Sequence, residues 1–263
     1  MFVRTGELVV HAQVAGPADA PALMLLHSLG TSLHVWDAQA DALAGRFRVI
    51  RPDLRGHGLT GVPAGPYEIA AMAADMLALL DALGVAAAHV AGLSIGGAVA
   101  QSLAARASGR VLSLVLCDTA MVFPPPTLWR ERAAVARTQG MEPLVGPVLS
   151  RWVTPDFLAT PQAEGLRAML RRTAPEGYAG AAEALAAADL TASTATLRVP
   201  TLVLVGEHDQ ATPPAAARAI QAAIPGAELA ELPGVAHIPT VQRPADVTDV
   251  IAAFLARHAA EGV

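Results

Sequence analysis

Short runs rich in valine, leucine and isoleucine alternate along the chain with longer segments whose apolar positions recur at helical spacing. Apolar runs of this length are typical of strands buried in a parallel sheet, and the helical segments between them are typical of crossover connections. The runs predict strands over residues 7–14, 22–27, 47–51, 88–93, 111–117, 200–206 and 227–232. The helical periods predict helices over residues 33–43, 69–83, 95–107, 214–224 and 245–258. This alternation predicts an α/β fold, with a mostly parallel sheet and helices on both of its faces.

One segment, residues 121–193, interrupts the alternation. It opens with three consecutive prolines, Pro124 to Pro126, and continues with helical stretches and no clear strand. The segment is several times longer than an ordinary connection, and insertions at the end of a sheet strand commonly build pocket walls and lids. We therefore expect a core domain made of residues 1–120 and 194–263, with a helical cap at residues 121–193. Residues 7–14 alternate apolar and polar positions, which predicts an antiparallel edge strand.

The composition narrows the chemistry that the chain can carry. Of its 263 residues, 53% are hydrophobic and 16% are charged, which is typical of a globular protein with a large core. All 18 basic residues are arginine, so a lysine Schiff base and a phosphate-binding P-loop lysine are both excluded. The net charge is −5, and we expect no nucleic-acid partner because no basic surface would attract one.

Cys117 is the single cysteine. A disulfide framework, a cysteine-ligated zinc site and an iron–sulfur cluster each need several thiols, so all three are excluded and a cytoplasmic location is expected. Residues 1–11 lack the apolar segment of a secretory signal. No run approaches the roughly 18 to 20 apolar residues that span a bilayer, and we expect no membrane association.

The strongest chemical signal is the sequence Gly-Leu-Ser-Ile-Gly at residues 92–96, between a predicted strand and a predicted helix. This pattern and context are typical of a nucleophile elbow, in which small residues on either side of Ser94 let the backbone pass close to itself. The serine hydroxyl then stands exposed at a helix N-terminus. The alternative is a glycine-rich turn that contains an incidental serine.

A nucleophilic serine needs a histidine to take its proton and an acid to orient that histidine. Asp209 follows the strand predicted at 200–206 and is our candidate acid, with Glu207 as the alternative. His237 follows the last predicted strand, 28 positions after Asp209, and is the candidate base. The competing histidines lie near the termini (His11, His258), before the nucleophile strand (His89) or beside the acid (His208). The chain order serine, aspartate, histidine is that of α/β-hydrolases.

Acyl transfer also needs donors for the developing oxyanion. We expect the backbone N–H groups of Ile95 and Leu29 to provide them, although residues 27–30 could also form a plain turn between a strand and a helix. A metal site could be imagined at Asp53, His57 and His27. No clustered histidine motif is present, however, and we expect no metal. The first turn between a strand and a helix lacks the glycine pattern of a dinucleotide site.

Beyond the elbow, the chain resembles the α/β-hydrolase superfamily over nearly its whole length, and within it the 3-oxoadipate enol-lactonases. The motifs that carry the resemblance are His-Ser-Leu-Gly-Thr at 27–31, Arg-Gly-His-Gly at 55–58 and Gly-Pro-Tyr at 65–67 in the core, and Thr-Leu-Trp at 127–129, Arg-Trp-Val-Thr at 151–154 and Glu-Gly-Tyr-Ala-Gly at 176–180 in the cap. The chain departs from the family at His27 and Asp118, where asparagine is frequent, and at residues 238–240 after the histidine.

This resemblance implies an eight-stranded α/β-hydrolase fold and an enzyme that hydrolyses 3-oxoadipate enol-lactone to 3-oxoadipate, a step of aromatic catabolism in the β-ketoadipate pathway. No cofactor is implied. Ser94 would attack the lactone carbonyl with His237 as base, although direct attack by water is an open alternative. A general carboxylesterase or a cofactor-free perhydrolase would use the same triad on another small ester, and a non-catalytic ligand-binding protein is a more distant alternative.

The implied substrate carries a carboxylate, which calls for an arginine or other donors. The cap offers Arg130, Arg132, Arg137 and Arg151, and the sequence leaves the choice among them open. Trp129, Arg130 and Trp152 form the predicted substrate-binding set, although either tryptophan could instead belong to the core of the cap.

Overall fold

The computed structural model describes residues 1–258, so the last five residues of the predicted core segment lie outside the described residues. Eight strands form one sheet in the order β1-β2-β4-β3-β5-β6-β7-β8. The strands are β1 (Phe2–Thr5), β2 (Leu8–Ala15), β3 (Ala22–Leu26), β4 (Arg48–Pro52), β5 (Ala88–Leu93), β6 (Val111–Cys117), β7 (Thr201–Gly206) and β8 (Glu228–Leu232). From β4 to β8 every neighbouring pair is parallel. The predicted α/β class and mostly parallel sheet are confirmed.

The N-terminal edge of the sheet differs from the prediction. Residues 7–14 were expected to form an edge strand, but β2 pairs with both β1 and β4, antiparallel to each. The edge is β1, which turns into β2 through Gly6 and Glu7, with Gly6 at a φ of 65°. The prediction missed β1 because the strand is short and mostly exposed, so it lacks the run of buried residues that marks β3, β5 and β7.

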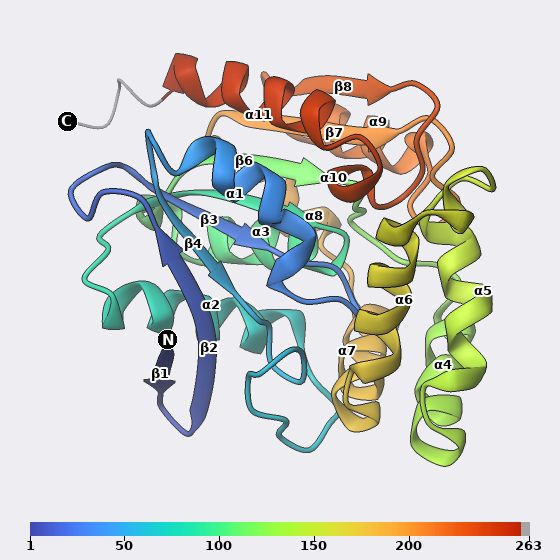
Figure 1. The fold of residues 1–263 in the computed structure, drawn as a ribbon. Helices are drawn as coiled ribbons and strands as arrows, with labels where there is room; N and C mark the ends of the chain where they lie inside the picture. Colours follow the sequence, from blue (N-terminus) through green and yellow to red (C-terminus); the bar gives the residue numbers. More distant parts are fainter. Residues whose placement is uncertain (259–263) are drawn as a thin grey trace.

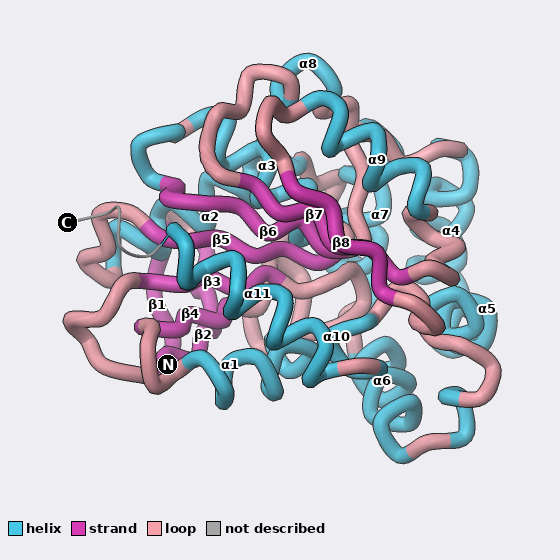
Figure 2. Tube along the Cα trace, turned by 90° about the horizontal axis from the view of Figure 1, so that it is seen from above, coloured by secondary structure: helices cyan, strands magenta, loops and turns pink. Residues whose placement is uncertain are grey.

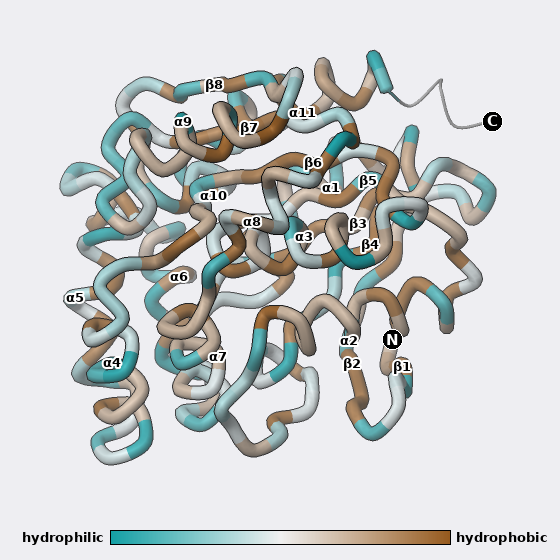
Figure 3. Tube along the Cα trace, turned by 180° about the vertical axis from the view of Figure 1, so that it is seen from behind, coloured by the Kyte–Doolittle hydropathy of each residue, from teal (hydrophilic) through white to brown (hydrophobic). Residues whose placement is uncertain are grey.

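Helices cover both faces of the sheet. Figure 2 shows α1 (Asp37–Leu43), α10 (Pro239–Gln242) and α11 (Pro244–His258) on one face and α2 (Ile69–Ala82), α3 (Ile95–Arg106), α8 (Thr191–Thr194) and α9 (Pro214–Ala223) on the other. The helix predicted over 33–43 begins as a 3-10 turn at Leu33–Trp36 before α1. Every residue of β3, β5 and β7 is buried, and Figure 3 shows hydrophobic colours along β7. Their largely apolar sequences are typical of strands that are covered on both faces.

The segment between β6 and β7 is helical. It contains α4 (Pro126–Gln139), α5 (Glu142–Trp152), α6 (Pro161–Arg172) and α7 (Pro175–Ala187), which lie together beyond the carboxyl ends of the parallel strands (Figure 1). Proline is the first residue of α4, α6 and α7, where its missing N–H costs no intrahelical hydrogen bond. The two ends of the segment meet in an isolated antiparallel bridge between Val122 and Asp189. We propose that residues 121–193 form a cap on the core.

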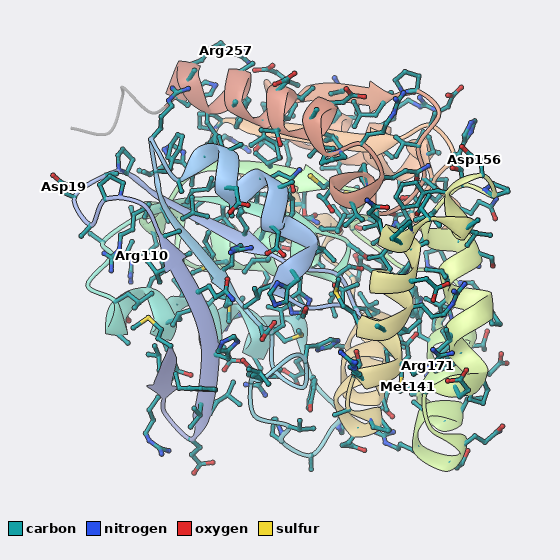
Figure 4. All side chains as sticks on the ribbon, viewed as in Figure 1. Asp19, Arg110, Met141, Asp156, Arg171 and Arg257 are labelled. Carbon is teal, nitrogen blue, oxygen red and sulfur yellow. The ribbon has the colours of Figure 1, made fainter. Side chains whose placement is uncertain are left out.

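Ion pairs tie the cap helices to one another. Arg171 of α6 binds both carboxylate oxygens of Glu142 at the start of α5, at 2.5 and 2.7 Å, and Figure 4 labels Arg171 close to Met141, the residue before α5. Arg137 of α4 binds Glu176 and Glu183, both on α7. Arg137 therefore has carboxylate partners within the cap and is not free to bind a substrate.

Glycines let the cap contact the core closely. A Cβ atom at Gly177 would lie 1.9 Å from the carbonyl oxygen of Gly56, and a Cβ atom at Gly180 would lie 2.9 Å from the ring of Tyr67. The Glu176 carboxylate also accepts the N–H of Gly65 at 2.8 Å. The sequence Glu-Gly-Tyr-Ala-Gly at 176–180 therefore seats α7 directly on the loops after β4. No helix in residues 1–258 is long and apolar enough to cross a membrane.

Candidate active site

Ser94 lies in a sharp turn between β5 and α3. Its φ is 58°, a left-handed conformation that is uncommon for residues other than glycine. A Cβ atom at Gly92 would lie 2.2 Å from the Gly96 carbonyl oxygen, and one at Gly96 would lie 2.4 Å from the Leu26 carbonyl oxygen. Side chains at these two positions would therefore clash with backbone. The turn has the geometry of a nucleophile elbow, and the glycines are required by its close backbone contacts.

His237 and Asp209 meet at the carboxyl ends of β8 and β7. The His237 Nδ1 lies 2.8 Å from Asp209 Oδ2, and both side chains are almost fully buried. Asp209 also accepts hydrogen bonds from the Thr212 hydroxyl at 2.8 Å and from the backbone N–H groups of Ala211 and Thr212. Burial disfavours its charge, but His237 and these donors outweigh that effect and hold the pKa of Asp209 below its usual value.

Glu207, the alternative acid, lies elsewhere. Its side chain is exposed, and its carboxylate accepts the backbone N–H of Gly234 at 2.8 Å. The sequence alone left the choice open between Glu207 and Asp209, and the structure brings Asp209 into contact with the histidine.

Ser94 and His237 line the same pocket, which has about 320 Å³ of empty space when its part open to solvent is included. The core contributes Ser28, Leu29, Ser94, Ala211 and His237, and the cap contributes Trp129, Arg132, Val148, Arg151, Trp152 and Tyr178. The cap therefore forms one wall of the pocket over the nucleophile. Trp129 and Trp152 are both buried and both line this wall, so the two roles considered for them coincide.

The predicted oxyanion donors flank the nucleophile. Ile95 is the first residue of α3, where the helix leaves the N–H without an intrahelical partner. Leu29 lines the pocket, and its N–H donates to no acceptor within residues 1–258. Both N–H groups are free to bind an oxyanion.

Two buried imidazoles hold the loop that carries Leu29. His57 Nε2 accepts the N–H of Gly30 at 3.0 Å, and its Nδ1 donates to the Arg55 carbonyl oxygen. His27 Nε2 accepts the N–H of Leu54 at 2.9 Å, and its Nδ1 donates to the Ser28 carbonyl oxygen. All four ring nitrogens are occupied by backbone groups, which leaves no lone pair for a metal ion. The two histidines therefore stabilise the conformation of the loop through hydrogen bonds to its backbone and to the neighbouring backbone.

The pocket contains arginines, but Arg130 is not one of them. Arg130 is exposed on α4, whereas Arg132 and Arg151 line the pocket. Residues two positions apart point to nearly opposite sides of a helix, so Arg130 and Arg132 cannot share the same face. We therefore replace Arg130 with Arg132 and Arg151 in the candidate binding set.

Neither pocket arginine forms an ion pair in the described part of the chain. Arg132 lies over the ring of Trp129, with 5.1 Å between its Cζ and the ring centroid. Arg151 donates to the Gln210 carbonyl oxygen at 2.5 Å. Burial and the nearby charge of Arg132 lower the pKa of Arg151 from its usual value. The pocket therefore holds two positive charges without carboxylate partners, an arrangement that favours an anionic ligand.

The family described as alpha/beta hydrolase fold matches residues 21–244. The chain belongs to the α/β-hydrolase family. The 3-oxoadipate enol-lactonase 2 of Acinetobacter baylyi is 34% identical to this α/β-hydrolase over 244 residues, which cover 92% of this chain and 91% of the relative. The protein is a hydrolase, and the predicted resemblance to enol-lactonases is confirmed.

Solved structures agree with this assignment. The enol-lactonase from Burkholderia xenovorans matches this α/β-hydrolase with a TM-score of 0.95 and 38% identity, over 97% of this chain and 100% of that one. A thermophilic esterase from Thermogutta terrifontis, solved with malate bound, matches with a TM-score of 0.90 and 31% identity, over 95% and 94% of the two chains. The chain is similar to both an enol-lactonase and an esterase, so the residues of the pocket have to distinguish between the two kinds of substrate.

Sequence reasoning missed two residues at the candidate site of this α/β-hydrolase, one in the pocket and one beside the acid. Tyr178 is fully buried in α7 and is one of the residues that line the pocket, and its buried hydroxyl has no hydrogen-bond partner within residues 1–258. Burial raises the pKa of Tyr178, so the hydroxyl stays protonated and can donate at neutral pH. Thr212 supports Asp209, and only its position three residues after the acid could have indicated this.

Protonation of His57 is expected to destabilise this α/β-hydrolase as the pH falls. Burial lowers the pKa of His57 from 6.5 to about 3. At pH values between these two, only the unfolded chain binds the proton, so stability is lost as the pH falls below the unfolded value. Between about pH 7.5 and about pH 5, this one imidazole should lower the free energy of unfolding by about 2 kcal/mol. Urea unfolding at the two pH values measures the loss.

The matched control is His57→Gln, whose amide oxygen can still accept the Gly30 N–H but does not titrate. Its free energy of unfolding should change with pH by about 2 kcal/mol less than that of the unmodified protein. The same pH dependence in both proteins would show that His57 does not contribute in this way.

Proposed function

We propose that the protein is a serine hydrolase that opens a small carboxylate-bearing lactone, 3-oxoadipate enol-lactone, to give 3-oxoadipate in aromatic catabolism by the β-ketoadipate pathway. The observation that carries the proposal is the pair of arginines without carboxylate partners, Arg132 and Arg151, in one pocket with Ser94 and His237. An anionic group on the substrate would satisfy the arginines while the lactone carbonyl faces the serine. Tyr178, whose buried hydroxyl has no hydrogen-bond partner within residues 1–258, lines the same pocket.

In the first half of the proposed reaction, His237 removes the proton of the Ser94 hydroxyl as the serine oxygen attacks the lactone carbonyl. Asp209 holds the His237 ring through Nδ1, so that Nε2 is the basic nitrogen, and stabilises the imidazolium that forms. The N–H groups of Leu29 and Ile95 donate to the oxyanion of the tetrahedral intermediate. One such donor is typically worth about 3 kcal/mol of the activation barrier.

In the second half, the ring C–O bond breaks and the enol oxygen leaves with a proton from the imidazolium. The enol then converts to the ketone. A water molecule, deprotonated by His237, attacks the acyl-enzyme and releases the second carboxylate while Ser94 regains its proton. The serine and the histidine supply the nucleophile and the base, so the proposed reaction needs no cofactor.

Two observations support an enol-lactone over a simple ester. The relatives named enol-lactonase cover nearly the whole chain, including the cap that walls the pocket. The cap also supplies both arginines and Tyr178. A solved structure similar to this chain is named an esterase. The two candidate substrates to compare are therefore a lactone that carries a carboxylate and an ester without a charge.

The test is a spectrophotometric assay of enol-lactone ring opening beside hydrolysis of 4-nitrophenyl acetate. We expect kcat/KM for the enol-lactone to exceed that for the ester by about 100-fold or more, because a charge-assisted contact to the carboxylate contributes roughly 1.5 to 3 kcal/mol and a second contact adds to it. The opposite ranking would keep the serine hydrolase and discard the lactone.

Variants of the arginines separate charge recognition from general catalysis. Arg132→Gln and Arg151→Gln should each lower kcat/KM for the enol-lactone by about 10- to 100-fold, mainly through KM, because each removes a charged contact. Hydrolysis of 4-nitrophenyl acetate should change much less. Arg130→Gln is the matched control, since Arg130 lies on the same helix as Arg132 but outside the pocket. Equal effects on both substrates would argue against carboxylate binding by these arginines.

A further inference from the structure

A second buried carboxyl group, that of Asp118, lies beside the candidate acid and base. Asp118 follows β6 just as Asp209 follows the neighbouring parallel strand β7, so both residues emerge at the same edge of the sheet. Asp118 is fully buried and has a φ of 42°. One oxygen of Asp118, one oxygen of Asp209 and one ring nitrogen of His237 all lie within 4.8 Å of one another. The proposed mechanism leaves this third group without a role.

The surroundings of the two carboxyl groups differ. Asp209 accepts four hydrogen bonds, from Ala211, twice from Thr212 and from His237. Asp118 Oδ1 accepts only the Gly206 N–H, at 2.8 Å, and Asp118 Oδ2 is buried and accepts no hydrogen bond from residues 1–258. Two adjacent buried carboxyl groups cannot both ionise easily, and the donors stabilise the charge on Asp209. The proton therefore resides on Asp118.

The other titratable groups near Asp118 agree with this distribution. Burial and the neighbouring Asp209 both raise the pKa of Asp118 well above its usual value. The adjacent Cys117 thiol is itself buried, its pKa is raised, and it offers no positive charge to Asp118. The positive charges in the neighbourhood, Arg151 in the pocket and His237 when protonated, act on Asp209.

We propose that Asp118 is a positioning residue, a reserve acid whose neutral carboxyl group donates a hydrogen bond to Asp209 and which ionises to support His237 when the charge of Asp209 is removed. The inference rests on the proposed triad. In the intact protein the pair carries one negative charge and one proton. When Asp209 is replaced by a neutral residue, the like charge is gone, and Asp118 releases its proton to solvent. A carboxylate within 4.8 Å of the His237 ring can then stabilise the imidazolium directly or through one bridging water.

A double-mutant cycle tests this role. Asp118→Asn keeps an oxygen for the Gly206 N–H and an N–H for Asp209 but cannot ionise. We expect Asp118→Asn to lower kcat/KM at least tenfold more in an Asp209→Asn background than in the unmodified protein. The pKa of the acid limb of the kcat/KM profile should also fall, by about one unit, only in the Asp209→Asn background, because only there does Asp118 supply the charge that stabilises the imidazolium.

The cycle is measured on 4-nitrophenyl acetate, so it does not depend on the lactone. Equal losses in the two backgrounds, with no difference in the acid limb, would overturn the role of Asp118 and leave the triad standing. Full activity of Asp209→Asn would instead overturn the triad itself. Thermal unfolding of each variant shows whether it is folded, and an Asp209→Ala background repeats the cycle without an amide beside His237.

Infrared spectroscopy provides a measurement that needs no change at Asp118. At neutral pH the unmodified protein should show the carbonyl band of a buried protonated carboxyl group. In Asp209→Asn this band should disappear, because Asp118 is then ionised. Absence of the band from the unmodified protein, or its persistence in Asp209→Asn, would contradict the proposal.

Discussion

Ser94→Ala should lower kcat for both the enol-lactone and 4-nitrophenyl acetate by about 10⁴-fold or more. The hydroxyl is the proposed nucleophile, and the oxyanion donors and the pocket account only for the residual rate above that in water. Alanine keeps the Cβ of Ser94 and removes only the oxygen, so the melting temperature should stay nearly unchanged. Steady-state kinetics and thermal unfolding of the same preparation measure the two effects.

The control is Ser102→Ala, which removes a buried hydroxyl from the same helix, α3, outside the pocket. It should leave kcat nearly unchanged. Substantial turnover of the enol-lactone by Ser94→Ala, with loss of ester hydrolysis, would indicate direct attack by water on the lactone. Retention of both activities would reject Ser94 as the nucleophile.

The elbow shows how the fold supports this chemistry. A residue held at a positive φ such as that of Ser94 costs about 1 to 3 kcal/mol and persists only where its surroundings impose it. Here β5 is fully buried and ten of the twelve residues of α3 are buried, so strand and helix are both held in place by packing. The Ser94 N–H also donates to the Cys117 carbonyl oxygen at 3.0 Å, and the Thr119 hydroxyl donates to the Ser94 carbonyl oxygen at 2.7 Å. The packing of the strand and the helix thus maintains the positive φ of Ser94 in the turn between them.

The sequence predicted those features that depend on local pattern. The strands β3, β5 and β7 are fully buried runs of mostly apolar residues, and the elbow has glycines where the backbone leaves no room for a side chain. The order of serine, aspartate and histidine after β5, β7 and β8 was also predictable, because the carboxyl ends of parallel strands lie at one edge of the sheet. The contact between Asp209 and His237 agrees with that order.

Features that depend on tertiary packing were not predictable in this way. The sequence did not distinguish the four cap arginines as ligands of a carboxylate. The structure separates them because α4 turns Arg132 but not Arg130 toward the pocket, and because Arg137 is paired with two glutamates. Tyr178 belongs to a segment whose glycines seat α7 on the core, and nothing in the sequence of that segment shows that the tyrosine lines the pocket. Asp118 is the first residue after β6, a position that by itself indicates no function. Its proposed role follows only from its proximity to Asp209 and His237.

Asp209→Asn should lower kcat by about 10²- to 10⁴-fold, with the upper end typical of a triad that loses its only acid. An amide can donate to His237 Nδ1, which would place the proton of the neutral ring on Nε2 and leave no basic nitrogen facing Ser94. The buried imidazolium would also lose the charge that stabilises it. Asp118, if it ionises as proposed, keeps the loss toward the lower end of this range.

Glu207→Gln is the matched control, since it makes the same change of carboxylate to amide two residues earlier. Glu207 is exposed, and its contact with the Gly234 N–H can be kept by the glutamine oxygen, so kcat should stay within about threefold of the unmodified protein. The measurement is kcat across the pH range for both variants, with folding checked by thermal unfolding. A large loss in Glu207→Gln together with a small one in Asp209→Asn would transfer the role of the acid to Glu207.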